Sequence, residues 1–159
     1  MSSDEYFMRE ALAEAKLAFS KKEVPVGAVL VLNEKIIARA HNLVETLADA
    51  TAHAEMLCLR KGAEVLSNWR LNGATLYCTL EPCPMCAGAM IHSRLARLVW
   101  GACDLRCGAH GSWANLLDMK HPIHQVETAS GILTGECSEL MKSFFKIRRM
   151  EKEDGTIIR

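Results

Sequence analysis

The stretch that most restricts the fold is residues 73–91, where a strand pattern runs directly into the start of a helix. Residues 74–80 alternate between two sets of side chains, which is typical of a β-strand. Pro84 suits the first position of a helix, because its fixed φ is helical and its missing N–H needs no partner there. We therefore expect a helix from Pro84 to about Ile91, with Cys83 as its N-cap. A strand that leads so quickly into a helix favours a layered α/β protein.

The other segments follow the same alternation of helix and strand patterns. A first helix is expected through Phe19 with Ser2 or Ser3 as its cap, and a second from a Thr51 cap to about residue 66. The remaining expectations are a hairpin turning at Asn33–Glu34, strands over 96–101 and near His124–Glu127, and a last helix containing residues 140–148. Residues 101–124 are rich in glycine, cysteine and histidine, with at most a short helix around Trp113–Leu117. A long irregular stretch in a small domain is often functional.

Composition indicates one globular domain over residues 1–159, without a membrane span. Half of the residues are apolar, yet no apolar run approaches the roughly 20 residues that cross a bilayer. The polar first ten residues lack the apolar stretch of a signal peptide. The 19 basic residues balance 19 acidic ones, which disfavours a generally basic nucleic-acid binder but leaves a local basic patch open. Seven cysteines without a disulfide-like spacing suit the reducing cytoplasm.

Two short motifs, HAE at 53–55 and PCPMC at 82–86, each lie at the expected start of a helix. Cys86 would be the third helical residue, on the same face as Cys83, so both sulfurs lie near the positive end of the helix dipole, which favours thiolates. Two helix tips could bring His53, Cys83 and Cys86 to one ion. One nitrogen and two thiolates suit Zn²⁺ and leave a fourth position for water. Glu55 would then lie beside that water as a proton carrier.

Simpler interpretations of the same residues remain open. A lone CxxC after a strand can be a redox pair, and a histidine near a helix start is often a cap or a packed core residue. A closed structural zinc site would need a fourth ligand, from Cys78, Cys103, Cys107 or a loop histidine. Cys58, Cys78 and Cys137 fall at positions expected in the core, whereas nothing in the sequence assigns Cys103 or Cys107.

Four segments together carry a resemblance to a known family: EVPVGAVLV, TAHAEM, TLEPCPMCAGAMIHSR and SFFKIRR. The H-x-E…P-C-x-x-C signature is similar to that of the zinc-dependent cytidine/deoxycytidylate deaminases. The longer segments resemble the bacterial tRNA-specific adenosine deaminases. This resemblance implies a three-layer α/β/α sandwich with a central mixed five-stranded sheet. It also implies hydrolytic conversion of adenosine to inosine at the wobble position of tRNA, with release of ammonia.

The resemblance also implies roles for individual residues. His53, Cys83 and Cys86 would hold one Zn²⁺ per subunit, and Glu55 would be catalytic. Substrate-binding roles would fall to three further residues: Asn42, Asp104 and Phe145. From the local pattern alone, Asn42 could instead hold a turn, Asp104 could be a turn residue, and Phe145 could pack in the core. The partners implied are a tRNA anticodon stem-loop and a second copy of the chain, because the family forms homodimers.

Phosphate contacts would need a local cluster of cations. The clearest source is the end of the last helix, with Lys142, Lys146, Arg148, Arg149 and Lys152, although these residues could equally form a solvated face. Two alternative functions share the same motifs. One is deamination of a free base, nucleoside or nucleotide, such as cytosine or guanine; the other is a non-catalytic RNA-binding module with a structural zinc.

Overall fold

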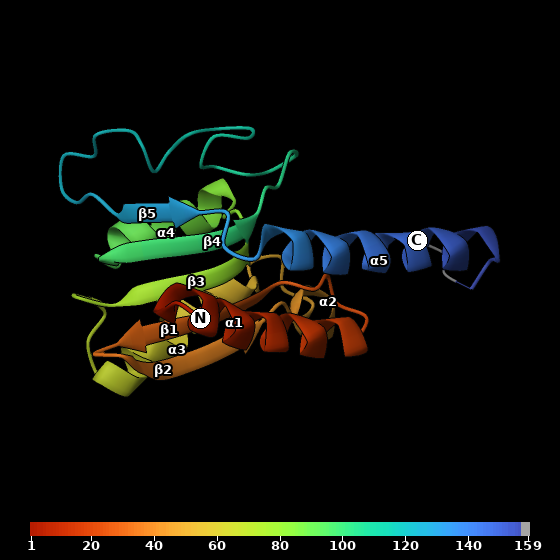
Figure 1. Ribbon diagram of the computed structural model, residues 1–159, viewed down its shortest axis with the longest axis horizontal. Coiled ribbons are helices and arrows are strands. Elements are labelled where there is room, and N and C mark those ends of the chain that lie inside the picture. Colours follow the sequence, from red (N-terminus) through yellow and green to blue (C-terminus); the bar gives the residue numbers. More distant parts are fainter. Residues whose placement is uncertain (157–159) are drawn as a thin grey trace.

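A mixed five-stranded sheet forms the centre of the protein (Figure 1). The computed structural model describes residues 1–156. The strands are β1 (Gly27–Leu32), β2 (Lys35–His41), β3 (Thr75–Leu80), β4 (Arg97–Ala102) and β5 (Glu127–Ser130). Their order across the sheet is β2-β1-β3-β4-β5; β1 is antiparallel to both β2 and β3, whereas β3, β4 and β5 run parallel. The predicted α/β fold with a mixed five-stranded sheet is confirmed.

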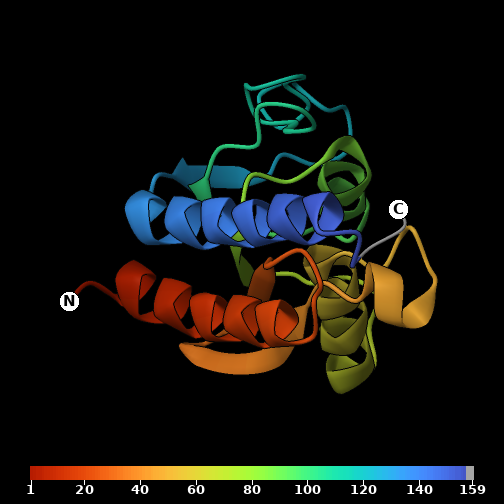
Figure 2. The same cartoon turned by 90° about the vertical axis from the view of Figure 1, so that its right-hand side faces the viewer.

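Helices cover both faces of this sheet. They are α1 (Ser3–Ser20), α2 (Val44–Leu47), α3 (Ala54–Leu66), α4 (Pro84–His92) and α5 (Thr134–Glu153). Helices α1 and α5 lie side by side on one face, as Figure 2 shows, and Arg9 of α1 pairs there with Glu136 of α5 at 3.0 Å. Helices α3 and α4 pack against the other face. No helix within residues 1–156 has the combined length and apolar character needed to cross a membrane.

The sheet is buried on both sides, so its central strands contribute to two separate cores. On β3, Leu76 and Cys78 belong to the cluster under α3 and α4, whereas Tyr77 belongs to the cluster under α1 and α5. Each fully buried side chain of the size of Leu or Met contributes about 1.5–3 kcal/mol. The alternation seen in residues 74–80 therefore separates two apolar faces rather than an apolar face from a polar one.

Local signals in the sequence place most of the elements correctly. The Ser2 hydroxyl accepts a hydrogen bond from the Glu5 amide at 3.2 Å and caps α1. Asn33 and Glu34 have φ values of 50° and 61°, the left-handed conformation that a two-residue turn between twisted antiparallel strands requires. Helix α4 begins at Pro84 with Cys83 as its N-cap, as expected.

The expected cap of the second helix is wrong by two residues. His53, not Thr51, is the N-cap of α3, because its extended backbone (φ −69°, ψ 150°) precedes the first helical residue and its carbonyl accepts from Leu57. The Thr51 hydroxyl instead donates to Asp49 at 2.7 Å in the preceding loop.

One further expectation, the position of the last strand, needs correction. The last strand is Glu127–Ser130 rather than near His124, because the His124 ring lies 2.6 Å from the Leu95 carbonyl, outside the strand ladder. Residues 113–117 form no helix; a single bridge joins His110 to Asn115. The four-residue helix α2 was not expected at all.

Candidate functional site

The three predicted metal ligands meet at the N-termini of α3 and α4. His53 caps α3, Cys83 caps α4 and Cys86 is the third residue of α4. The sulfurs of Cys83 and Cys86 each lie 3.5 Å from Nδ1 of His53, and the three ligand atoms all lie within 4.8 Å of one another. The three donors, from segments 30 residues apart in the chain, therefore form one compact His-Cys-Cys metal site.

Hydrogen bonds among these three groups favour one thiolate. The bond that the Cys86 thiol donates lowers the pKa of Cys83 to about 4, and the same bond to the neighbouring sulfur raises the pKa of Cys86. The pKa of His53 is raised, chiefly by its hydrogen bond with Cys83. The cluster thus already holds a soft anionic donor beside an imidazole, a combination suited to a borderline-soft cation.

No fourth protein ligand joins the cluster within residues 1–156. Cys78 is fully buried in the core, and Cys103 and Cys107 are exposed. The geometry therefore favours an open three-ligand site over the closed structural site that the sequence left possible. Cys58, Cys78 and Cys137 are buried, as expected for core thiols.

Glu55 is the second residue of α3 and lines a cavity of about 320 Å³ that is also lined by His53 and Cys83. Its side chain is only 4% exposed, and burial is the main reason why its pKa is raised. A buried carboxyl group with a raised pKa is a common choice for accepting and donating a proton during a reaction. The volume of the cavity is at the lower end of the range for small-molecule sites, about 300–1,000 Å³.

The three residues expected to bind substrate all line this cavity. Asn42 is 7% exposed and also holds a turn: its Nδ2 donates to the Val24 carbonyl at 3.3 Å, and its Oδ1 accepts from the Val44 amide at 3.4 Å. Those two bonds leave one N–H and one lone pair of the amide for a ligand. The two interpretations of Asn42 are therefore compatible.

Asp104 similarly combines a turn with a position on the cavity wall. Its Oδ1 accepts hydrogen bonds from the amides of Arg106 and Cys107 at 3.2 and 3.3 Å. This contact stabilises the irregular loop after β4 and brings Arg106 and Cys107 to the cavity beside Asp104.

The two adjacent phenylalanines of α5 have different surroundings. Phe144 is 5% exposed and packs edge-on against Phe19 of α1, with ring centroids 5.7 Å apart. Phe145 is only partly buried, and it lines the cavity beside Met141. Phe144 is therefore the core residue of this pair. The local pattern had also allowed a core position for Phe145, but part of its ring is exposed in the cavity.

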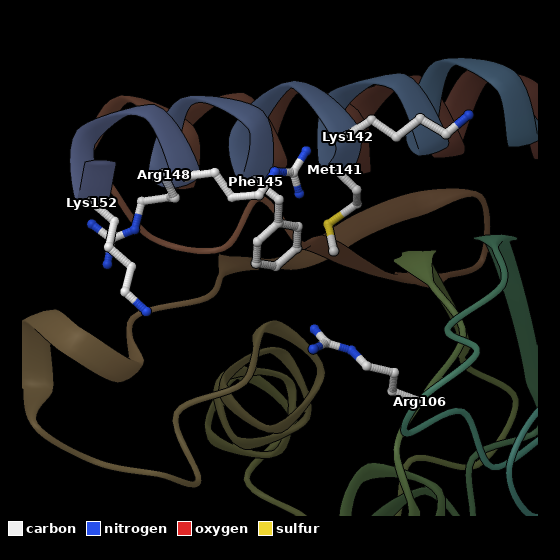
Figure 3. Close-up of a pocket in the computed structure, with 7 residues that line it drawn as sticks. Arg106, Met141, Lys142, Phe145, Arg148 and Lys152 are labelled. Atoms are coloured by element: carbon white, nitrogen blue, oxygen red, sulfur yellow. The ribbon is translucent and has the colours of Figure 1, made fainter. Parts of the chain in front are cut away.

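A basic groove of about 510 Å³ adjoins the cavity along α5 (Figure 3). Arg106, Met141 and Phe145 line both spaces. In Figure 3, Met141 and Phe145 point from the helix toward the guanidinium group of Arg106, which lies 5.9 Å from the Phe145 ring. The remaining lining residues of the groove are Lys142, Arg148, Arg149 and Lys152. Lys146 is exposed but does not line the groove, so four of the five expected cations of this helix gather on one side.

Two further cavity residues were not anticipated from the sequence. Glu23 and Glu81 also line the cavity, and each is only 1% exposed. The sequence feature that could have indicated them is a glutamate next to an apolar strand segment, in "EVPV" for Glu23 and in "TLEP" for Glu81. The contacts that satisfy these carboxylates come from distant loops, which the local pattern does not reveal.

Comparison with known proteins places the chain in a family. A family model described as MafB19-like deaminase matches residues 1–149. The tRNA-specific adenosine deaminase of Bacillus subtilis is 52% identical over 153 residues, covering 96% of this chain and 95% of that protein. That of Haemophilus influenzae is 49% identical, covering 94% and 87%. A solved structure from work on A-to-I editing by tRNA:A34 deaminases has a TM-score of 0.82 at 44% identity, covering 85% of this chain and 98% of that one.

Proposed function

Because the chain belongs to the tRNA-specific adenosine deaminases of the cytidine deaminase-like superfamily, we propose that it converts adenosine to inosine at the wobble position of tRNA, releasing ammonia. The observation that carries this function is a His-Cys-Cys cluster beside a buried glutamate, in a cavity that opens onto a basic groove.

The residues at the cluster fit one Zn²⁺ held by His53, Cys83 and Cys86. Tetrahedral bonds of about 2.0 Å to nitrogen and 2.3 Å to sulfur separate those two donors by about 3.5 Å. The observed separations of 3.5 Å between His53 Nδ1 and each sulfur are close to that value. When bound, the metal would act as a Lewis acid that lowers the pKa of water at the site.

Glu55 is the proton carrier of the proposed reaction. It takes a first proton from the water that attacks C6 of the adenine and delivers it to the ring nitrogen; it then carries the second proton of the same oxygen to the leaving amine. The C6–N bond then breaks, ammonia departs and inosine remains. The buried position of Glu55 supports this role, since desolvation raises its pKa and so its affinity for a proton.

The shape of the site supports a flipped nucleotide within a single-stranded loop as substrate. A stacked base could not reach a carboxylate that is 4% exposed, so the adenosine must leave the stack and enter the cavity. There the free N–H and lone pair of Asn42 can bind the purine edge, and the partly open Phe145 ring can stack on a neighbouring base. Asp104 contributes a carboxylate to the wall of the same cavity.

The basic groove supports an extended RNA partner over a free base. Arg106, Lys142, Arg148, Arg149 and Lys152 line it immediately outside the cavity, where the phosphates of an anticodon stem-loop would pass. A free nucleobase carries no phosphate and gains nothing from these cations, so the alternative of free-base deamination leaves the groove without a purpose.

The assembly and compartment are also part of the proposal. We expect two copies of the chain to form the active homodimer, and sedimentation equilibrium would test this directly. All seven cysteines are free, which supports a reducing cytoplasm as the working compartment.

The decisive experiment compares Glu55→Gln with the wild type on a tRNA anticodon stem-loop, measuring inosine and ammonia. We expect a loss on the order of 10²–10⁴ in rate with zinc content unchanged. Glu64→Gln, an exposed glutamate on the same helix, is the matched control and should retain full activity. Free adenosine, cytidine and guanine should be poor substrates. Near-normal turnover by Glu55→Gln, or equal turnover of a free base, would overturn the assignment.

A further inference from the structure

Two loops form separate parts of the cavity wall, and each is attached to a buried carboxylate. The first contains Asn42 and α2, from which Val44 and Glu45 line the cavity; the second is the loop after β4, which contributes Asp104, Arg106 and Cys107. Glu23 and Glu81, the carboxylates beneath them, are each 1% exposed. Within residues 1–156 neither has a cationic partner within 4 Å.

Within residues 1–156, all hydrogen bonds that the Glu81 side chain accepts come from the loop after β4. Its Oε1 accepts from the Asp104 amide at 3.2 Å and also from the Ser112 hydroxyl. Its Oε2 accepts from the amides of His110 and Ser112 at 3.0 and 3.2 Å. The loop approaches so closely that a Cβ at Gly108 would lie 2.2 Å from Oε2, so only glycine fits there. One side chain therefore joins both ends of a nine-residue loop segment.

Glu23 makes the corresponding contact with the first loop. Its Oε1 accepts from the Glu45 amide at 2.9 Å, and its Oε2 accepts from the Thr46 amide at 2.8 Å. These amides belong to the first turn of α2, where N–H groups lack intrahelical partners. Leu43, the N-cap residue of the helix, has an apolar side chain that cannot accept a hydrogen bond from these amides. Glu23 therefore caps α2 from a distant segment.

We propose that Glu23 and Glu81 are positioning residues that hold two walls of the nucleotide cavity by accepting backbone N–H bonds, an inference that rests on the proposed deaminase function. Within residues 1–156, neither carboxylate is hydrogen-bonded to His53, Cys83 or Cys86. Burying a carboxylate without a cation is costly unless its oxygens are well bonded, and here the bonds come from backbone of the cavity wall. The two side chains thereby fix where Asp104, Arg106 and Asn42 meet the substrate.

This arrangement predicts an effect on substrate affinity rather than on chemistry. Glu81→Gln and Glu23→Gln keep the side-chain shape but replace one acceptor oxygen by an NH₂ donor, so at least one backbone N–H loses its partner. A loosened wall occupies its binding position for a smaller fraction of the time, so the KM for the stem-loop should rise about 10- to 100-fold. The kcat should stay within about three-fold, because Glu55 and the metal ligands are unchanged.

Amide hydrogen exchange tests the two contacts separately. Glu81→Gln should speed exchange at Asp104, His110 and Ser112 but not at Glu45 or Thr46, and Glu23→Gln should show the reverse pattern. Ser112→Ala is a milder second variant that removes one donor to Glu81 and should raise KM by a smaller factor, should Glu81→Gln fold poorly. Glu64→Gln on the exposed face of α3 is the control for a Glu-to-Gln exchange, and zinc content is measured for every variant.

Each result bears on the proposal in a different way. Faster exchange in the matching loop together with a raised KM and a nearly constant kcat supports it. Unchanged exchange, or faster exchange with an unchanged KM, overturns it, as does a fall in kcat at constant KM. A wild-type protein that forms no inosine in the stem-loop refutes the proposed function instead, while the exchange pattern still shows whether the carboxylates hold the loops.

Discussion

Removing cations from the groove along α5 should flatten the salt dependence of RNA binding. The perturbation is the triple variant Lys142→Ala, Arg149→Ala and Lys152→Ala, which removes three of the five cations that line the groove. Arg148 is kept because it lies 5.9 Å over the Phe144 ring and pairs with Glu151 at 3.9 Å, so its loss would also disturb packing.

The expected magnitude follows from counting phosphate contacts. Each neutralised phosphate contributes about 0.7–0.9 to the slope of log K against log salt, so three contacts contribute about 2–3. Between about 50 and 200 mM salt, the wild type should therefore lose about 20- to 40-fold more affinity than the triple variant. The three side chains are exposed, so the free energy of unfolding should change by less than about 0.5 kcal/mol.

The assay is fluorescence anisotropy of a labelled anticodon stem-loop over a range of salt concentrations, on a Glu55→Gln background that prevents turnover. Lys146→Ala is the matched control, because this exposed lysine is on the same helix but outside the groove. A triple variant with the wild-type slope would refute the groove as the phosphate path. An equally reduced salt slope in the Lys146→Ala protein would show that the overall charge of the helix, rather than the groove, governs RNA binding.

Three other perturbations have clear expected outcomes. Cys86→Ala should lose most of the bound zinc by elemental analysis, and full stoichiometry would contradict the ligand set. Asp4→Asn should cost about 1 kcal/mol at neutral pH, because a bidentate bond with Arg97 lowers the pKa of Asp4 from its ordinary 3.8. A lowered pKa stabilises the fold above the ordinary value, and this stabilisation is lost as pH falls through the lowered one. Urea denaturation should therefore show the difference in stability between the two proteins closing as pH falls below 3.8; a constant difference would exclude this cause. Gly27→Ala should cost about 3 kcal/mol, because its Cβ would lie 2.0 Å from a carbonyl oxygen of α1. Gly88→Ala meets nothing within 4 Å and should be neutral or stabilising, and equal melting temperatures for the two would contradict the packing argument.

Helix starts were predictable where the chain carries its own local signal. Pro84 and Ser2 act on the backbone within one turn, so their effect is visible in the sequence. The start of α3 was misplaced because Thr51 bonds to Asp49 rather than to the helix. A hydroxyl next to a helix has several partners within reach, and only the path of the loop decides among them.

The alternation over residues 74–80 correctly predicted a strand, but it did not show that both faces of the strand are buried. Alternation indicates a strand whether one face or both are buried, and here Tyr77 and Cys78 lie in opposite cores. The position of the last strand depends on its pairing of Glu127 with Arg97, a contact 30 residues away. Such long-range pairing leaves little trace in the local pattern.

The sequence by itself determined the donor chemistry, because His, Glu and Cys in the order H-x-E and P-C-x-x-C at helix starts have few other uses in combination. It also determined that cations gather near the end of the last helix. The fold was needed to show that each of the two sulfurs lies 3.5 Å from Nδ1 of His53 and that no fourth ligand joins them in the part of the chain described. It was also needed to show that Phe145 rather than Phe144 lines the cavity. It alone joined Glu23 and Glu81 to distant loops. The physical reason is that residue type sets which bonds a group can make, whereas packing of remote segments sets which of those bonds form.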